Sequence, residues 1–171
     1  VLAELREPSR LGAGAEIPGL QAQLRPYQAV GVNWLWFLAR LGLGGCLADD
    51  MGLGKTLQAL AIMLQRAPGG PTLVVAPTSV CMNWVSEANR FAPTLNITVL
   101  GSGNREQLVG KLGGMDVLVT SYGLLYQEAE LLASVPWRTI VLDEAQAIKN
   151  VAAKRSQAAM NLQGAFRLIT T

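Results

Sequence analysis

The sequence predicts an α/β fold in which a mostly parallel central sheet carries helices on both faces. Strand-like and helix-like segments alternate along the 171 residues. The strand-like segments are short apolar runs, as expected for strands buried on both faces of a parallel sheet. A glycine-containing turn also joins the first of these strands to the helix after it. In sheets of this kind, ligands bind at the carboxyl ends of the strands.

Apolar runs bounded by glycine, proline or polar residues predict the strands. We expect strands near 45–49, 72–76, 97–100, 116–120, 139–143 and 166–170. Apolar residues at helical spacing predict helices at 26–41, 55–66, 80–91, 104–112, 122–133 and 152–162. The segments 68–71 and 101–103 are rich in glycine and proline or serine, and they separate neighbouring elements.

The turn after the first predicted strand has the end chemistry of a phosphate-binding loop. Gly52 and Gly54 let successive backbone N–H groups point at an anion. Lys55 adds a positive charge, and the Thr56 hydroxyl can ligate Mg²⁺. The full pattern G-x-x-x-x-G-K-[ST] has a glycine where Asp49 stands. We expect a nucleotide phosphate site here, and the alternative is a glycine-rich turn that caps a helix.

Two adjacent carboxylates, Asp143 and Glu144, follow the apolar run 139–142. At the carboxyl end of a parallel strand, one acid can hold Mg²⁺ through its water shell, and the next can polarise a water that attacks a γ-phosphate. The alternative is an ordinary acidic start to a helix, which the helix dipole favours. Together with the earlier phosphate loop, the acid pair predicts nucleotide hydrolysis.

The composition agrees with this fold and excludes several kinds of site. Half of the residues are hydrophobic and 15% are charged, which fits buried strands. The chain has no histidine, and its two cysteines, Cys46 and Cys81, lie in unrelated segments, so a zinc site and a histidine-based triad are excluded. A reducing, intracellular compartment is the default expectation. The net charge of +2 does not by itself indicate nucleic acid.

The segment 30–48 is nearly uncharged, with Arg40 as its only ionised residue. Asn33 and the glycines near position 44 leave too short an apolar stretch for a membrane span. We therefore expect a core helix and no membrane partner.

Residues 1–23 contain several prolines and glycines and have no sustained period. We expect them to form an N-terminal linker or tether, because no signal-peptide pattern is present. Since the chain does not begin with Met, we expect it to be a piece of a longer protein.

Six segments carry a family resemblance, and they stand in a fixed order. They are Leu24-Arg25-Pro26-Tyr27-Gln28, the loop 49–56, the segment 73–79 with Trp84 after it, the segment 116–122, the acidic box 142–150, and 168–171. In this order they resemble the motifs of the first RecA-like lobe of a Swi/Snf-type, superfamily-two helicase-like ATPase. The resemblance covers 24–171 and implies a RecA-like P-loop domain. It also accounts for Asp49, because the family's loop reads Asp-Asp-Met-Gly-Leu-Gly-Lys-Thr.

The resemblance implies a role for each matching residue. The nucleotide would contact Arg25, Gln28, Asp50, Met51, Gly52, Leu53, Gly54, Lys55, Thr56 and Gln146. The amide of Gln28 would pair with adenine, although a solvent-facing helix residue is the alternative. Lys55 and Glu144 would be catalytic, with Glu144 as the base, while Thr56 and Asp143 would serve the metal. Many relatives carry His or Gly at the position of Gln146.

Four hydroxyl residues follow two of the predicted strands, and we expect them on loops at one edge of the sheet. These residues are Thr78, Ser79, Thr120 and Ser121. Hydroxyls and backbone N–H groups at such loops can hold DNA phosphates without reading the bases. Capping of helices by Ser and Thr is the alternative, and the resemblance favours nucleic acid.

The resemblance implies the ATP-binding half of a DNA translocase that uses ATP and Mg²⁺. Its expected partners are the backbone of double-stranded DNA, a C-terminal RecA-like lobe of the same protein, and a DNA-bound protein complex as target. Because such motors take an arginine from the second lobe, this chain alone should bind ATP but hydrolyse it poorly. The final motif at 168–171 is not complete in the chain.

Three other functions compete with this one. They are a strand-separating helicase or restriction-enzyme motor, a non-catalytic nucleotide-binding interaction module, and a small-molecule kinase with a phosphate loop. We expect the protein in the cytoplasm, on the nucleoid if it is bacterial, or in the nucleus if it is eukaryotic.

Overall fold

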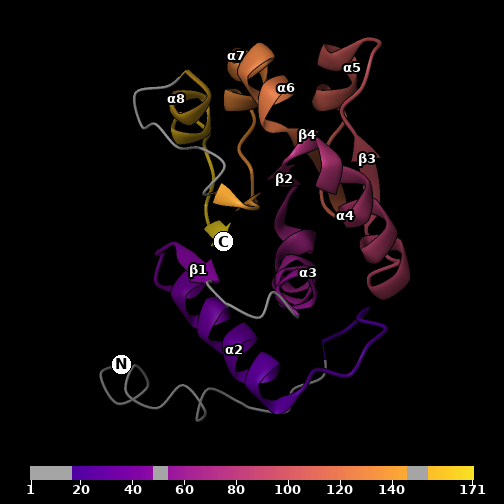
Figure 1. Cartoon of the computed structure of the whole chain (residues 1–171), viewed down its shortest axis with the longest axis vertical. Helices are drawn as coiled ribbons and strands as arrows, with labels where there is room; N and C mark the ends of the chain where they lie inside the picture. Colours follow the sequence, from indigo (N-terminus) through magenta and orange to yellow (C-terminus); the bar gives the residue numbers. More distant parts are fainter. Residues whose placement is uncertain (1–16, 48–53, 146–153) are drawn as a thin grey trace.

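The computed structural model describes residues 17–47, 54–145 and 154–171 (Figure 1). Strands and helices alternate through most of the chain. In chain order the elements are α2 (Pro26–Arg40), β1 (Gly45–Leu47), α3 (Lys55–Arg66), the 3₁₀ helix η2 (Ala67–Gly69), β2 (Thr72–Ala76), α4 (Thr78–Phe91), β3 (Asn96–Val99), α5 (Arg105–Gly110), β4 (Asp116–Ser121), α6 (Tyr122–Gln127), α7 (Ala129–Ala133), β5 (Thr139–Leu142), α8 (Lys154–Met160) and β6 (Arg167–Thr170).

The strands form one six-stranded sheet in the order β1-β6-β5-β2-β4-β3, and neighbouring strands pair in parallel. The register brings several strand ends level with one another. Leu47 at the end of β1 pairs with Thr170, and Ala76 at the end of β2 pairs with Ser121. Between them β5 ends one residue before Asp143. We call this side of the sheet the carboxyl edge and the opposite side the amino edge.

Helices cover both faces of the sheet because each strand points alternate side chains to opposite faces. In β2, Val74 and Ala76 belong to the apolar cluster that contains α3 and α4 and part of α2. Leu73 and Val75 belong to a second cluster, formed with α5, α6, α7 and α8. Figure 1 shows these last four helices in a row at one side of the sheet. The structure is therefore a three-layer α/β domain, as predicted.

Helix α3 is the most enclosed helix of the first layer, because residues 59–63 have no exposed surface. It packs against α2, which also lies against β1. Gly31 permits close packing here, since a Cβ at this position would come within 2.3 Å of the Gln58 side-chain oxygen. This packing fixes the start of α2 beside the start of α3.

The amino edge is tied together by a buried arginine at the end of α3. Arg66 donates from Nε to the Thr139 hydroxyl at 2.9 Å and from its guanidinium to the carbonyl of Arg138 at 2.9 Å. Its guanidinium also lies over the Phe166 ring, 5.2 Å from the centroid. Burial, together with the nearby charge of Arg138, lowers the pKa of Arg66 to about 10. These contacts join α3 to the start of β5.

The predicted α/β fold and the existence of all the predicted strands are confirmed, but several boundaries differ. The expected helix 122–133 is two helices, because the backbone leaves helical geometry at Glu128 (φ −109°, ψ 31°). The expected helix 152–162 is described only as 154–160, and residues 48–49 of the first expected strand lie outside the described residues. In the described part of the chain, no helix is both long and apolar enough to cross a membrane.

Part of the expected N-terminal linker packs on the domain. Ile17 and Leu20 contact the first apolar cluster. The backbone N–H of Gln21 donates to the carbonyl of Phe91 at 2.7 Å. Residues 17–23 therefore lie against the lobe.

Truncation of a buried residue in β4 tests the packing of the second layer. Leu118 has no exposed surface, so Leu118→Ala should leave a cavity and lower the free energy of unfolding by about 2–5 kcal/mol. Urea denaturation followed by circular dichroism measures the change. Val99→Ala in the edge strand β3, where the side chain is 39% exposed, is the control and should change stability by about 0.5 kcal/mol or less. Equal effects of the two variants would contradict this packing.

Candidate functional site

The predicted site residues that the structure describes gather at the carboxyl edge of the sheet. Lys55 begins α3, Asp143 follows β5, Thr78 begins α4, and Ser121 ends β4. The parallel register places these segments on the same side of the sheet. Five of the predicted nucleotide residues, Asp50, Met51, Gly52, Leu53 and Gln146, lie outside the described residues.

The start of α3 depends on a glycine in a left-handed conformation. Gly54 has φ +86° and precedes the first residue of the helix, Lys55. The Lys55 ammonium donates to the backbone carbonyl of Thr171. The N–H of Thr171 in turn donates to the carbonyl of Leu47 at 3.1 Å. The lysine is thus held where β1 and β6 end, at the helix N-terminus that favours phosphate.

The adenine candidate Gln28 is buried beside the phosphate loop, so the alternative of a solvent-facing residue is wrong. Its side chain is 5% exposed, and its Oε1 accepts from the backbone N–H of Arg25 at 2.8 Å. A Cβ at Gly54 would come within 2.1 Å of Gln28 Nε2. The N–H of Arg25 therefore fixes the Gln28 Oε1 atom as the acceptor. Gly54, at the end of the loop, lies against the Nε2 atom of the same amide.

Asp143 is held by donors from several elements. Its Oδ2 accepts from the indole Nε1 of Trp84 at 2.7 Å. Its Oδ1 accepts from the Thr170 hydroxyl and from the N–H of Glu144, the latter at 3.0 Å. The backbone of Asp143 is also fixed, because its carbonyl accepts from the Tyr122 hydroxyl at 2.7 Å. Helices α4 and α6 and strand β6, together with β5 before it, therefore all determine where this carboxylate lies.

The second acid, Glu144, stands on a tight turn. Its φ of +47° is in the left-handed region, which residues other than glycine rarely adopt. Its side chain is exposed. Such backbone strain is concentrated at functional sites, where the surrounding structure maintains it.

The expectation that the four hydroxyl residues lie on loops is wrong. Thr78 and Ser79 are exposed but form the first turn of α4. Thr120 and Ser121 are the last residues of β4. The Thr120 side chain is 1% exposed and donates to the carbonyl of Ser121. The Ser121 hydroxyl caps α6 by accepting from the N–H of Leu124 at 3.2 Å, which is the capping role of the alternative.

Two neutral side chains surround the acids. Burial and the charges of Asp143 and Glu144 raise the pKa of Tyr122 well above its usual range, so its hydroxyl keeps the proton that it donates to Asp143. Burial, followed by the charge of Asp143, raises the pKa of the Cys81 thiol. This thiol lies toward the carbonyls of Ala76 and Pro77, at 3.7 and 3.5 Å.

The contacts of Trp84 and Tyr122 with Asp143 are not evident from the sequence. Trp84 belongs to the segment that carries the family resemblance, but its place on α4 gives it the spacing of an ordinary core residue. Tyr122 likewise reads as the apolar start of a helix. Both residues are separated from Asp143 by whole elements of the fold, so only the tertiary structure brings them together.

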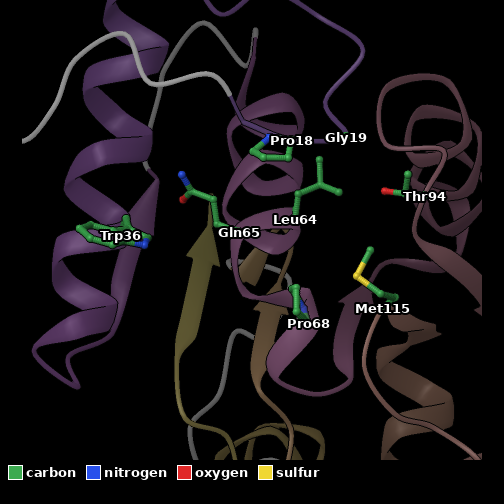
Figure 2. Close-up of a pocket in the computed structure, with 8 residues that line it drawn as sticks. All are labelled: Pro18, Gly19, Trp36, Leu64, Gln65, Pro68, Thr94 and Met115. Atoms are coloured by element: carbon green, nitrogen blue, oxygen red, sulfur yellow. The ribbon is translucent and has the colours of Figure 1, made fainter.

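An apolar pocket of about 470 Å³ lies away from this site, at the amino edge (Figure 2). Figure 2 shows Leu64 and Gln65 from the end of α3 and Trp36 from α2 among its walls. Its full lining is Pro18, Gly19, Trp36, Leu64, Gln65, Pro68, Thr94 and Met115. None of the predicted site residues that the structure describes is in this lining.

The described donors fit Mg²⁺. Asp143 supplies a carboxylate and Thr56 a hydroxyl, and both are hard oxygen ligands of the kind that Mg²⁺ prefers. Mg²⁺ usually binds through one or two carboxylates together with substrate phosphates. The place of Asp143 beside the strand end that also holds Lys55 agrees with that arrangement.

Fold and site together define a RecA-like α/β domain that carries a phosphate-loop helix and an acid pair at the carboxyl edge of a parallel sheet. The SNF2-related domain family matches residues 27–171. The chain belongs to this family.

Similar proteins agree with this assignment. The chain is 46% identical over 154 residues to the Bacillus subtilis protein "Putative ATP-dependent helicase/translocase YwqA", covering 86% of this chain and 17% of that protein. It is 39% identical over 162 residues to the ISWI chromatin-remodeling complex ATPase ISW1 of Saccharomyces cerevisiae, covering 89% of this chain and 14% of that protein. The chain thus spans less than a fifth of the length of either relative.

Solved structures match as well. The Sulfolobus solfataricus SWI2/SNF2 ATPase core in complex with dsDNA aligns with a TM-score of 0.82 at 41% identity, covering 92% of this chain and 33% of that one. The ATPase core domain from the same organism, in a second structure, aligns with a TM-score of 0.78 at 38% identity, with 95% and 33% coverage.

The two cysteines should differ in reactivity. Cys46 is exposed, whereas Cys81 is buried and its pKa is raised. A smaller fraction of Cys81 is therefore present as the reactive thiolate at neutral pH. Iodoacetamide should alkylate Cys81 at least about tenfold more slowly than Cys46. Mass spectrometry of peptides from timed samples measures both rates. The difference should disappear in urea, and equal rates in the folded protein would contradict the burial of Cys81 near Asp143.

Proposed function

We propose that this chain is the ATP-binding half of an ATP-dependent DNA translocase of the Swi/Snf type, which couples ATP hydrolysis to movement on duplex DNA or to remodelling of protein–DNA complexes. One observation carries the proposal. The Lys55 ammonium binds the carbonyl of Thr171, while the hydroxyl of the preceding Thr170 binds Asp143. The phosphate-loop lysine and the metal-binding acid therefore meet at one strand end. The activities named for the similar proteins support the same function.

Four residues at this edge have a chemical role in hydrolysis. Lys55 contacts the β- and γ-phosphates, and Thr56 and Asp143 hold the metal ion. Mg²⁺, when bound, neutralises charge on the phosphates. Glu144 accepts the proton of the attacking water. Its exposed side chain is accessible to such a water.

Contact with DNA is proposed for the start of α4. Thr78 and Ser79 are exposed there, and backbone N–H groups in the first turn of a helix have no partner inside the helix. Such groups hold phosphates and carry no sequence information. With a net charge of only +2, binding should be weak, independent of sequence and sensitive to salt. A relative that was solved in complex with dsDNA supports this partner.

Adenine nucleotides should bind in preference to guanine nucleotides. The Gln28 amide is fixed by the N–H of Arg25, so it would face a carbonyl in guanine where adenine offers an amine. The preference should be about 1–3 kcal/mol, or about 5- to 150-fold in affinity. Isothermal titration calorimetry with Mg·ATP and Mg·GTP measures it.

Gln28→Ala should remove this preference, whereas Gln23→Ala, which changes an exposed glutamine in the segment before α2, should retain it. Lys55→Ala should weaken the binding of both nucleotides, since both carry the same phosphates. A preference that survives Gln28→Ala would show that another residue reads the base.

Hydrolysis should need more of the core than this chain provides. The solved ATPase cores are about three times as long, since the chain covers 33% of each. In such motors an arginine from the second lobe stabilises the transition state, which is typically worth about 10³–10⁵ in rate. We expect the 171 residues to bind Mg·ATP and to release phosphate at a rate lower by about that factor than the whole protein. Phosphate release at saturating ATP, with two duplexes of unrelated sequence, measures this.

In the whole protein, Glu144→Gln should abolish turnover without loss of nucleotide binding. The matched control is Glu130→Gln, which changes an exposed acid on α7 and should leave turnover unchanged. Full DNA-stimulated hydrolysis by the 171 residues alone, lost in Glu144→Gln, would show that the site is complete without a second lobe. Stimulation by only one of the duplexes would contradict sequence-independent DNA contact.

A further inference from the structure

One donor to Asp143, Trp84, comes from the same helix as the proposed DNA contacts. Trp84 lies on α4, the helix whose first turn carries Thr78 and Ser79. Tyr122 directly follows Ser121 at the end of β4. Helix α4 and the first residue of α6 are therefore both bonded to the acid that is proposed to serve the metal.

These two contacts have little freedom to adjust separately. The Trp84 side chain is 3% exposed, and its ring packs in the first apolar cluster. Its indole donates to the Asp143 carboxylate at 2.7 Å, which is the short distance of a hydrogen bond to a charged acceptor. Tyr122 is also buried, in the second cluster, and holds the carbonyl of the same residue. A shift of α4 or of the end of β4 must therefore move Asp143 or break one of these bonds.

We infer that Trp84 and Tyr122 are positioning residues that couple DNA contact to the metal-binding acid. DNA held at the start of α4 shifts the helix, and the indole N–H transmits the shift to the Asp143 carboxylate. Tyr122 fixes the backbone of Asp143, so a shift that reaches the carboxylate also moves the end of β5. This inference rests on the proposed function, because it needs both a nucleotide at Asp143 and DNA at α4.

Trp84→Phe tests the coupling, because phenylalanine keeps an aromatic ring in the core but lacks the N–H donor. Partners that orient a metal ligand typically contribute about 10- to 100-fold to metal affinity or activity. In the whole protein, the Mg²⁺ concentration needed for half-maximal nucleotide binding should rise by about 10- to 100-fold, and the stimulation of ATP hydrolysis by duplex DNA should fall by at least about tenfold. Tyr122→Phe, which loses only a hydroxyl, should change both quantities in the same direction.

Trp137→Phe is the matched control. Trp137 is 1% exposed and also donates from Nε1, to the carbonyl of Leu132 at 2.9 Å. It precedes β5 at the amino edge, away from Asp143. This variant should lower the unfolding temperature at least as much as Trp84→Phe but should leave the Mg²⁺ dependence and the DNA stimulation unchanged.

A second measurement reads the contact without nucleotide, metal or turnover. Protein labelled with 5-fluorotryptophan should lose one ¹⁹F resonance in Trp84→Phe, which assigns that signal. Addition of duplex DNA to the nucleotide-free protein should shift this resonance, while the resonance lost in Trp137→Phe should stay in place. Fluorescence anisotropy of a labelled duplex shows independently that DNA is bound.

The outcomes separate the coupling from the proposed function. If DNA binds and stimulates hydrolysis, but the Trp84 resonance does not move and Trp84→Phe retains full stimulation, the coupling is wrong and the proposed function stands. If duplex DNA neither binds nor stimulates hydrolysis, the proposed function is wrong and the coupling falls with it. Equal losses of stimulation in Trp84→Phe and Trp137→Phe would show a structural effect and would also overturn the coupling.

Discussion

The parallel register at the centre of the sheet is the constraint on which the site depends. Ala76 pairs with Ser121, and the N–H of Asp143 donates to the carbonyl of Val75 at 2.8 Å, so three strands end together. On the other side of β5, Leu47 pairs with Thr170. A slip of one residue in any of these pairs would turn apolar side chains to the wrong face. Burial on both faces therefore maintains the alignment that brings loop, acid and hydroxyl residues to one edge.

Asp143 is the residue at which the aligned strand ends meet. A partly buried carboxylate needs hydrogen-bond donors, and here they come from Trp84, Thr170 and the following N–H. The turn that supplies this N–H is strained, since Glu144 has φ +47°. The strain is maintained by the donors around it, and the two adjacent acids end in different environments. Asp143 is partly enclosed and Glu144 is exposed, which suits one to hold a metal and the other to meet water.

The amino edge of the sheet holds structural contacts, and the carboxyl edge holds the candidate site. At the amino edge, Arg66 joins α3 to the start of β5, and Trp137 donates within its own buried layer. At the carboxyl edge, Trp84 and Thr170 donate to Asp143, and Lys55 donates to Thr171. Because α3 runs from one edge to the other, with residues 59–63 fully buried, this helix is anchored far from Lys55 and the candidate site at its start.

The sequence by itself determined the layers and the candidate site. Continuous apolar runs such as 72–76 have to be buried on both faces, and a glycine-lysine-threonine turn between strand and helix is local chemistry, so both can be read without a structure. Which side chains contact one another was decided only by the tertiary structure. Trp84 has the spacing of a core residue and Thr120 that of a strand-end hydroxyl, yet the first donates to Asp143 and the second is enclosed. Contacts between residues dozens of positions apart depend on strand order and crossover packing, and neither leaves a periodic signal in the sequence.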